Sequence, residues 1–402
     1  MDVLIIAEFC LDFSKTDNGR FLYLAKTLSN DHNVEIITSS FYHATKSPRP
    51  VLQETWPFKI TFIKEPGYPK NICLQRFCSH YSWGKNVINY LRNRKKPDVV
   101  YCAVPSLSGP YAVAKFCEEN NIRFVIDVQD LWPEAFRMVY NIPVISDLAF
   151  FPFDFLANGI YKRADAICAV SETYVNRALQ VNKKCKTGTT VYLGTDLNTF
   201  DRFAAETSVS VKNENEIWLA YCGTLGSSYD LKCVIDALAL LQDESIKFIV
   251  MGDGPKKDEF EQYAKKNGVA ALFLGRLSYN QMCSTLCQCD ITVNPITHMA
   301  AQSIINKHAD YAASGLPVIS TQENEEYRKL VDTYQMGFNC KNGDAKDLAE
   351  KLKVLVKDKD LRLKMGKNAR RCAEEKFDRA VTYTAIVSSI YAGKQKSKDR
   401  NG

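Results

Sequence analysis

The sequence lacks the short motifs that mark several large enzyme classes. Its 402 residues contain no Gly-x-x-x-x-Gly-Lys-Ser/Thr loop and no Gly-x-Gly-x-x-Gly turn, so neither a P-loop protein nor a dinucleotide fingerprint is supported. The chain has five histidines and none is spaced as His-Glu-x-x-His, which leaves a zinc hydrolase without support. Gly-x-Ser-x-Gly is also missing, which argues against a Ser-His-Asp hydrolase.

Long hydrophobic runs are missing as well, since none approaches the roughly 20 apolar residues of a membrane span. The apolar start, residues 1–7, is too short for a signal sequence and carries no basic segment, so we expect a cytoplasmic protein. The fourteen cysteines are scattered, which is typical of reduced thiols. The net charge of +6 suits anionic ligands or an anionic membrane surface, but no nucleic-acid motif concentrates it, so we expect no nucleic-acid partner.

What the sequence does contain is a repeated alternation of short β-branched runs and helical patterns, which predicts parallel, doubly wound α/β domains. Periodicity is lost over residues 201–216, which we interpret as a linker. The predicted domains are therefore residues 1–200 and 217–375, followed by a C-terminal helix in 376–402 that returns to the first domain and ends in a frayed tail. The predicted strands are 3–7, 34–38, 60–63, 99–103, 124–128, 166–170 and 191–193, then 217–221, 248–251, 272–274, 291–294, 318–320 and 337–340.

The most informative stretch is residues 302–321, QSIINKHADYAASGLPVIST. A helix starting near Ser303 puts Ser303, Asn306, Lys307 and Asp310 on one polar stripe. Gly315 suits the left-handed position after such a helix, and the proline two residues later prevents its continuation. Because strands are predicted on both sides, the helix N-terminus should lie at the carboxyl edge of a parallel sheet, where ligands bind.

This stripe has the chemistry of a nucleotide diphosphate site. A helix N-terminus offers unpaired N–H groups and partial positive charge to phosphate, and Lys307 adds a full charge within reach of the same anion. One turn further, the carboxylate of Asp310 can accept hydrogen bonds from a sugar diol. The alternative is an ordinary surface helix with a Lys–Asp pair. Glycine-rich strand ends at residues 223–226, 252–255 and 275–276 would leave room for a nucleotide against the backbone.

The first half offers two further candidates. The loop over residues 8–19 is long and ends at Gly19, which either lets a ligand approach the backbone or simply begins a helix. The strand at 124–128 delivers Asp130 at its carboxyl end, where this residue is either a ligand or electrostatic group or the N-cap of the next turn. Two aromatic and basic segments, 83–96 and 142–163, either contact a membrane surface or pack in the core.

In order and spacing, the motifs resemble the GT-B glycosyltransferases, and specifically the family-4 retaining enzymes, over nearly the whole chain. The DLWPE and SxxNK…DY variants resemble the branch that builds bacterial surface polysaccharides. The resemblance rests on 18–20 (NGR), 127–134 (DVQDLWPE), 163–171 (RADAICAVS), 192–196 (YLGTD), 221–226 (YCGTLG), 252–255 (GDGP), 273–276 (FLGR), 303–307 (SIINK) and 310–318 (DYAASGLPV).

The resemblance implies two domains facing across a cleft, the second holding a UDP-linked or other nucleoside diphospho-sugar. Lys307 would neutralise the departing pyrophosphate, Asp310 would hold the ribose, and Asp130 would act in catalysis from the first domain. Because helix N–H groups and Lys307 can stabilise the leaving group, no metal or other cofactor is expected. Further donor contacts are implied for Gly19, Gly223, Thr224, Gly254, Pro255, Arg276, Leu277, Ser303 and Asn306.

Three positions depart from the family pattern. Most family-4 members place two glutamates eight residues apart around this helix, whereas this chain has Gln302 and Asp310. Many carry a histidine before the aspartate of the first-domain loop, where this chain has Gln129. The loop after Tyr221 lacks a nearby arginine, and Lys232 is its closest basic residue. The departures fall on the contacts to the donor sugar and the acceptor.

The resemblance therefore implies a glycosyltransferase that transfers a sugar, with retention, to a growing lipid-linked surface glycan at the inner face of the membrane. A sugar-nucleotide 2-epimerase of the same fold is one alternative, although it needs cleft carboxylates and a histidine in a histidine-poor chain. A non-catalytic protein that closes on a nucleotide sugar is another. Only an epimerase converts a donor without acceptor, and only the binding protein saturates with donor without releasing nucleotide.

Overall fold

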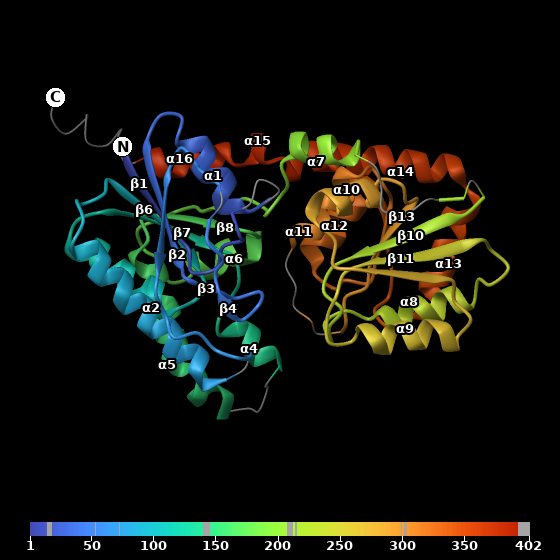
Figure 1. Ribbon diagram of the computed structural model, residues 1–402, viewed down its shortest axis with the longest axis horizontal. Coiled ribbons are helices and arrows are strands. Elements are labelled where there is room, and N and C mark those ends of the chain that lie inside the picture. Colours follow the sequence, from blue (N-terminus) through green and yellow to red (C-terminus); the bar gives the residue numbers. More distant parts are fainter. Residues whose placement is uncertain are drawn as a thin grey trace. The chain divides into compact units, whose positions relative to one another are not determined.

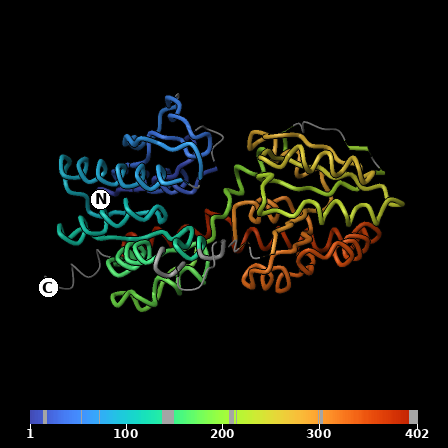
Figure 2. The backbone as a smooth tube through the Cα atoms, turned by 90° about the horizontal axis from the view of Figure 1, so that it is seen from below, coloured from blue at the N-terminus to red at the C-terminus, as the bar shows by residue number. Residues whose placement is uncertain are grey.

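The computed structural model describes residues 1–13, 18–52, 54–71, 73–139, 145–206, 212–213, 215–298, 300 and 304–392, without the side chains of 137–139 and 145–149. The chain divides into two compact units. Unit 1 comprises Met1–Tyr192 and Tyr383–Gly402, and unit 2 comprises Leu193–Thr382. Figures 1 and 2 show that the blue-to-green part of the chain builds unit 1, whereas the yellow and orange parts build unit 2.

Unit 1 is organised around a seven-stranded parallel sheet in the order β5-β2-β1-β6-β7-β8-β9. Its central strands are buried on both faces, which explains why they are continuous apolar runs. The strands are β1 (Asp2–Ile6), β2 (Asn33–Ser39), β5 (Lys59–Ile63), β6 (Val99–Val104), β7 (Arg123–Val128), β8 (Ala166–Ala169) and β9 (Thr189–Thr190), with a hairpin of β3 (Phe41–Tyr42) and β4 (Ser47–Pro48).

Helices complete unit 1, and α16 belongs to it although it comes from the far end of the chain. The ring of Tyr383, just before α16, lies 5.5 Å from that of Tyr23 in α1, and Tyr391 is hydrogen-bonded to His32. The helices are α1 (Arg20–Leu28), α2 (Leu74–Arg92), α3 (Ser108–Glu119), α4 (Glu134–Val139), α5 (Ile145–Arg163), α6 (Glu172–Leu179) and α16 (Thr384–Tyr391).

Unit 2 has a six-stranded parallel sheet in the order β12-β11-β10-β13-β14-β15. Its strands are β10 (Ile217–Cys222), β11 (Ile246–Met251), β12 (Ala271–Gly275), β13 (Ile291–Asn294), β14 (Val318–Ser320) and β15 (Gly337–Asn339). Its helices are α7 (Leu197–Ala204), α8 (Leu231–Ala239), α9 (Lys257–Lys266), α10 (Tyr279–Leu286), α11 (Asn306–Ala313), α12 (Glu325–Tyr334), α13 (Ala345–Lys357), α14 (Lys359–Cys372) and α15 (Arg379–Thr382), with a π-helical turn at Ala373–Phe377.

Two parallel sheets in two Rossmann-like units confirm the predicted fold class. The details at the junctions differ from the sequence prediction. The division falls at Tyr192, earlier than residue 200, and α7 lies where the linker was expected to begin. The Asp196 side chain caps α7 by accepting a hydrogen bond from the backbone N–H of Thr199, so a regular helix forms there. Within the described residues, no helix is long and apolar enough to cross a bilayer.

Candidate functional site

Helix α11 follows β13 and precedes β14 in unit 2, as the sequence predicts, but it starts at Asn306 rather than near Ser303. Ile305 has an extended backbone, and its N–H donates to Nδ1 of His308, which closes the first turn at this point. Ser303 lies outside the described residues. Gly315 has a φ of 67°, which is the left-handed conformation predicted for the residue that ends the helix.

The side chains of α11 are more buried than an ordinary surface helix would allow. Tyr311 fixes the helix to the carboxyl end of β10, because its hydroxyl accepts a 2.7 Å hydrogen bond from the backbone N–H of Cys222. Lys307 and Asp310 are each only 8% exposed. Asn306 is exposed. The polar stripe is therefore held at a fixed position beside the end of a central strand.

Lys307 is a buried lysine, and no acidic group of the described residues lies at bonding distance from its Nζ. Its Nζ has no hydrogen-bond partner in the described part of the chain, and it lies 3.8 Å from the ring centroid of Tyr229 and 4.8 Å from that of Tyr221. Burial lowers the pKa of Lys307 well below its usual range. Aromatic faces stabilise an ammonium only partly, so an anion arriving here would gain a charge-assisted hydrogen bond and relieve this cost.

Asp310 lies one turn further along α11 and is part of a hydrogen-bonded chain. Its Oδ1 accepts a 2.8 Å hydrogen bond from the Tyr279 hydroxyl, which is also 2.8 Å from the hydroxyl of Thr195. Burial raises the pKa of Asp310 to about 6, against the opposing effects of Tyr279, the positive charge of Arg379 and Thr195. The carboxylate is therefore oriented by α10 and by the start of unit 2.

The glycine-rich loops adjoin one another at the carboxyl ends of β10 and β11. A Cβ on Gly252 would lie 1.8 Å from the carbonyl oxygen of Gly223, and one on Gly254 would lie 2.5 Å from that of Leu225. Gly254 also has a φ of 158°, which disfavours other residues. Packing of one loop against the other thus requires glycine at both positions, and contact of this loop with a nucleotide stays a prediction.

The other predicted donor contacts in unit 2 lie at the same edge of the sheet. Thr224 and Pro255 are exposed in the loops after β10 and β11. Arg276 is exposed and Leu277 is half-buried directly after β12. Carboxyl ends of parallel strands share one edge of a sheet, so these residues and the start of α11 are on the same side of unit 2.

In unit 1 the predicted residues have local structural partners. Gly19 is the N-cap of α1 with an ordinary extended backbone. Arg20 is buried and makes two hydrogen bonds, of 2.8 and 3.0 Å, to the Asp127 carboxylate. Asp130 accepts hydrogen bonds from Nε1 of Trp132 and from the backbone N–H of Leu131, and burial raises its pKa. Its carboxylate is therefore fixed at the carboxyl edge of the sheet.

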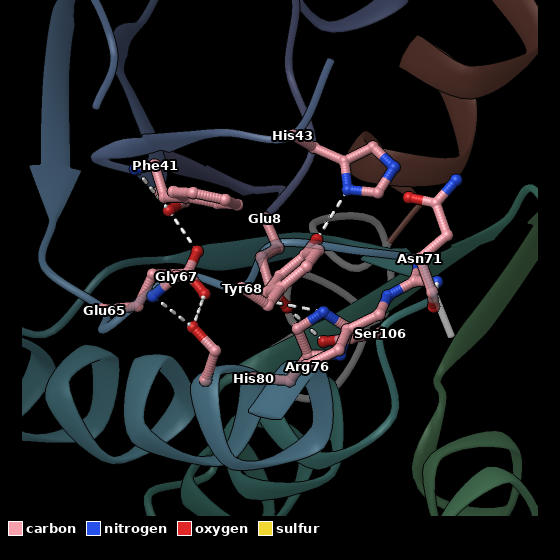
Figure 3. Close-up of polar contacts among 12 residues, drawn as sticks. Glu8, Phe41, His43, Glu65, Gly67, Tyr68, Asn71, Arg76, His80 and Ser106 are labelled. Carbon is pink, nitrogen blue, oxygen red and sulfur yellow. Dashed lines mark hydrogen bonds and ion pairs between the residues drawn. The ribbon is translucent and has the colours of Figure 1, made fainter. Parts of the chain in front are cut away.

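The sequence interpretation missed a group of side chains next to Asp130, which we call the unit 1 cluster: Glu8, His43, Glu65, Tyr68, Arg76, His80 and Ser106 (Figure 3). The cluster comes from the loops after β1, β2, β5 and β6 and from the start of α2. Glu8 directly follows the predicted first strand, and Glu65 and Ser106 follow two others. Their positions at strand ends were the one sequence feature that could have predicted the cluster. Because its members come from several separate segments, no single motif contains it.

Hydrogen bonds connect the members of this cluster. Ser106 donates a short hydrogen bond to Oε2 of Glu8, and Nδ1 of His43 is 2.5 Å from the Tyr68 hydroxyl. Burial and the nearby charge of Glu65 raise the pKa of Glu8 well above its usual range. Burial lowers the pKa of His43 to about 4, helped by Lys46 and Arg76, and it lowers that of His80 to about 3, helped by Arg76 and His43. At neutral pH both imidazoles are therefore uncharged, and the environment of Glu8 favours the protonated carboxyl.

Comparison with known proteins gives the class of the fold. Residues 203–372 match the family described as "Glycosyl transferases group 1". The sulfoquinovosyl transferase SQD2 of Arabidopsis thaliana is 26% identical over 174 residues, which are 43% of this chain and 32% of SQD2. The chain therefore spans about a third of the length of that relative.

Two solved structures match over nearly the whole chain. HepE of Anabaena in complex with UDP-glucose has a TM-score of 0.70, with 18% identity over 98% of this chain and 100% of that one. WaaG, a glycosyltransferase involved in lipopolysaccharide biosynthesis, has a TM-score of 0.64, with 14% identity over 97% and 99%. The fold is that of the GT-B glycosyltransferases, and unit 2 carries a group 1 glycosyltransferase domain.

Proposed function

We propose that the protein is a family-4 retaining glycosyltransferase that transfers a sugar from a UDP-linked donor to a lipid-linked surface glycan. The observation that carries this proposal is Lys307. A buried ammonium that lies beside two tyrosine rings and has no hydrogen-bond partner among the described residues, at the ligand-binding edge of a parallel sheet, calls for an anion. The diphosphate of a nucleotide sugar has the required charge.

In this proposal Lys307 neutralises the negative charge that develops on the diphosphate as the bond to the sugar breaks. Asp310, oriented by Tyr279, accepts hydrogen bonds from the ribose hydroxyls. The loop residues Thr224, Pro255, Arg276 and Leu277 contact the remainder of the nucleotide through their backbone. A single lysine with helix N–H groups supplies the positive charge that a metal ion provides in other transferases, so no metal is invoked.

The comparisons support this donor and this product class. The group 1 match covers the unit that contains Lys307 and Asp310. HepE was solved with UDP-glucose, and WaaG acts in lipopolysaccharide biosynthesis. The first comparison favours a UDP-sugar donor for this chain, and the second favours a surface glycan as its product.

Peripheral membrane attachment is part of the proposal, because the acceptor would be lipid-linked. Phe151 and Phe155 in α5 are 66% and 59% exposed, and the same helix carries the exposed Lys162. Exposed aromatic rings next to a positive charge suit the interface of an anionic bilayer. In the other aromatic and basic segment, 83–96, the side chain of Trp83 is buried and packs in unit 1 instead.

The proposal is tested by measuring the thermal stability of the protein with a panel of nucleotide sugars. A donor at about 100 times its dissociation constant should add about 2.7 kcal/mol to the free energy of unfolding. UDP-sugars should stabilise the wild type and fail to stabilise Lys307→Ala. If no nucleotide sugar shifts the melting temperature of the folded wild type, the proposal is wrong.

One observation favours a second candidate, a sugar-nucleotide 2-epimerase. That reaction needs carboxyl groups and a histidine, and Glu8 and His80 are close together in unit 1, with 3.7 Å between Oε1 and Nε2. Incubation of each stabilising UDP-sugar without acceptor separates the two enzymes. A new sugar nucleotide would identify the epimerase, nucleotide release only with a glycan acceptor would identify the transferase, and saturation without either would identify a binding protein.

A further inference from the structure

The unit 1 cluster contains an arginine whose charge has no ion-pair partner in the part of the chain that the structure describes. Arg76 is half-buried in the first turn of α2, where the helix dipole adds positive charge. Its guanidinium carbon lies 4.7 Å from the ring centroid of Trp132 and 5.6 Å from that of Tyr68. One nitrogen, Nη1, donates to the backbone oxygen of Asn71 at 2.8 Å. The aromatic rings therefore fix the guanidinium plane, and Nε has no hydrogen-bond partner among the described residues.

Three polar atoms of this cluster are buried with no hydrogen-bond partner among the described residues: Nε of Arg76, Nε2 of His80 and Oε1 of Glu8. Glu8 and His80 are each 2% exposed. Such atoms cost free energy unless a ligand or water satisfies them. Figure 3 shows Glu8, His80 and Ser106 gathered beside Arg76, so the three atoms belong to one site.

All three atoms can act as donors. The guanidinium Nε–H is a donor in every state, and Nε2 is a donor in one tautomer of the neutral imidazole. Burial raises the pKa of Glu8 and so favours its protonated form, and because Oε2 accepts from Ser106, a proton on this carboxyl can reside on Oε1. A site with several donors and a fixed positive charge suits a group that only accepts hydrogen bonds.

We propose that unit 1 binds an oxyanion carried by the acceptor, a carboxylate or a phosphate, and that Arg76 is the residue that selects it. The proposal rests on the transferase function, because it names the chemical class of the acceptor. A groove of about 460 Å³ adjoins the cluster, shares Glu65 and Tyr68 with it and is also lined by Lys46. This volume is sufficient for the sugar that carries the anion.

The test uses the full-length protein with labelled histidines, whose ring signals report on His43 and His80 without any need for activity. The probes are D-glucuronate, inorganic phosphate and D-glucose, each titrated at constant ionic strength. Glucuronate differs from glucose in a carboxylate, so their comparison isolates the anion. We expect glucuronate or phosphate to shift the two ring signals and raise the pKa of both histidines, and glucose to have no effect at equal concentration. The anion that binds more tightly, glucuronate or phosphate, shows whether the acceptor carries a carboxylate or a phosphate.

The variants are Arg76→Gln, Arg76→Lys and the control Arg92→Gln, which removes an exposed arginine from the same helix. Arg76→Gln should weaken anion binding at least about tenfold, Arg76→Lys should retain part of it, and Arg92→Gln should bind as the wild type. Equal responses to glucose and glucuronate, or unchanged binding in Arg76→Gln, would overturn the proposal. If Arg76→Gln does not fold, the comparison of glucuronate with glucose on the wild type still decides.

The same samples distinguish failure of this inference from failure of the proposed function. Stabilisation by UDP-sugars reports on unit 2 alone. If UDP-sugars bind and neither anion changes the ring signals of His43 and His80, the acceptor inference is wrong and the transferase proposal stands. If neither unit responds, both are wrong.

Discussion

The two units bury polar groups in opposite ways. Unit 2 holds the ammonium of Lys307 against two tyrosine rings, and its Nζ has no hydrogen-bond partner among the described residues. In the unit 1 cluster burial favours the uncharged forms of Glu8, His43 and His80, and the positive charge belongs to Arg76. The first arrangement lacks an anion, whereas the second has several internal hydrogen bonds and still leaves three buried polar atoms without a partner in the described part of the chain. The comparison indicates that charge is the main determinant of binding in unit 2 and that donor geometry matters more in unit 1.

The largest expected effect is that of Lys307→Ala on turnover. Loss of the charge that stabilises the leaving diphosphate should reduce kcat by about 100-fold or more, with folding intact. The measurement is nucleotide release with the best donor of the panel and a lipid-linked glycan extract. The control is Lys329→Ala, an exposed lysine of α12 in the same unit, which should retain wild-type turnover. Near-normal turnover of Lys307→Ala would mean that the charge of Lys307 is not the main determinant of binding in unit 2.

Replacement of Glu8 tests whether the unit 1 carboxyl is neutral. Glu8→Ala should lower the free energy of unfolding by about 2–3 kcal/mol, because it leaves a void and removes the partner of Ser106. Glu8→Gln keeps the shape and is uncharged, as the protonated acid is, so it should cost less than about 1 kcal/mol. Urea unfolding at pH 7 measures both. A Glu8→Gln variant as unstable as Glu8→Ala would mean that the carboxyl is ionised.

Asp310 predicts a pH dependence of stability. A carboxyl with a raised pKa binds its proton more tightly in the folded state, so its contribution is present at low pH and is lost as pH rises through about 6. Between pH 5 and pH 8 the wild type should lose about 1–2 kcal/mol that Asp310→Asn does not lose. Urea unfolding of both proteins without ligand measures the difference. Parallel pH profiles would show that Asp310 is not shifted.

The smallest expected effect on stability concerns the exposed rings of α5. Phe151→Ser combined with Phe155→Ser should change the free energy of unfolding by less than about 0.5 kcal/mol, because both side chains are mainly solvated. The same double variant should lose binding to vesicles that contain anionic lipid, measured by co-sedimentation at low salt. Vesicle binding equal to that of the wild type would separate membrane attachment from this surface.

Much of the fold could be predicted from sequence because parallel strands that are buried on both faces are read as short apolar runs. β1, β6 and β10 are examples, and all lie within or beside their predicted ranges. Helix boundaries were less predictable. α2 begins at Leu74, nine residues before the aromatic and basic segment at 83–96, and β9 is Thr189–Thr190 where 191–193 was predicted. The first turns of α2 have apolar residues at helical spacing, but Leu74 and Tyr81 remain exposed.

The candidate site divides in the same manner. Lys307 and Asp310 could be predicted because both lie within one helix turn of each other, on a segment whose end is marked by Gly315. Glu8, Arg76 and His80 could not, because their proximity depends on which strands are neighbours in the sheet. The absence of a side chain at Gly252 and Gly254 serves the contact between two loops, which sequence spacing could not show. Contact of Gly223 and Gly254 with a nucleotide stays a prediction.

The sequence by itself determined the alternation of strands and helices, hence two doubly wound units, and the polar pair on α11, because these depend on spacing along the chain. Only the tertiary structure decided that Lys307 is buried against Tyr229 and Tyr221, and that the ends of four strands and the start of α2 bring an arginine, a carboxyl and two histidines together. Burial and the pKa shifts that it causes are properties of packing between distant segments, and sequence spacing carries no information about them.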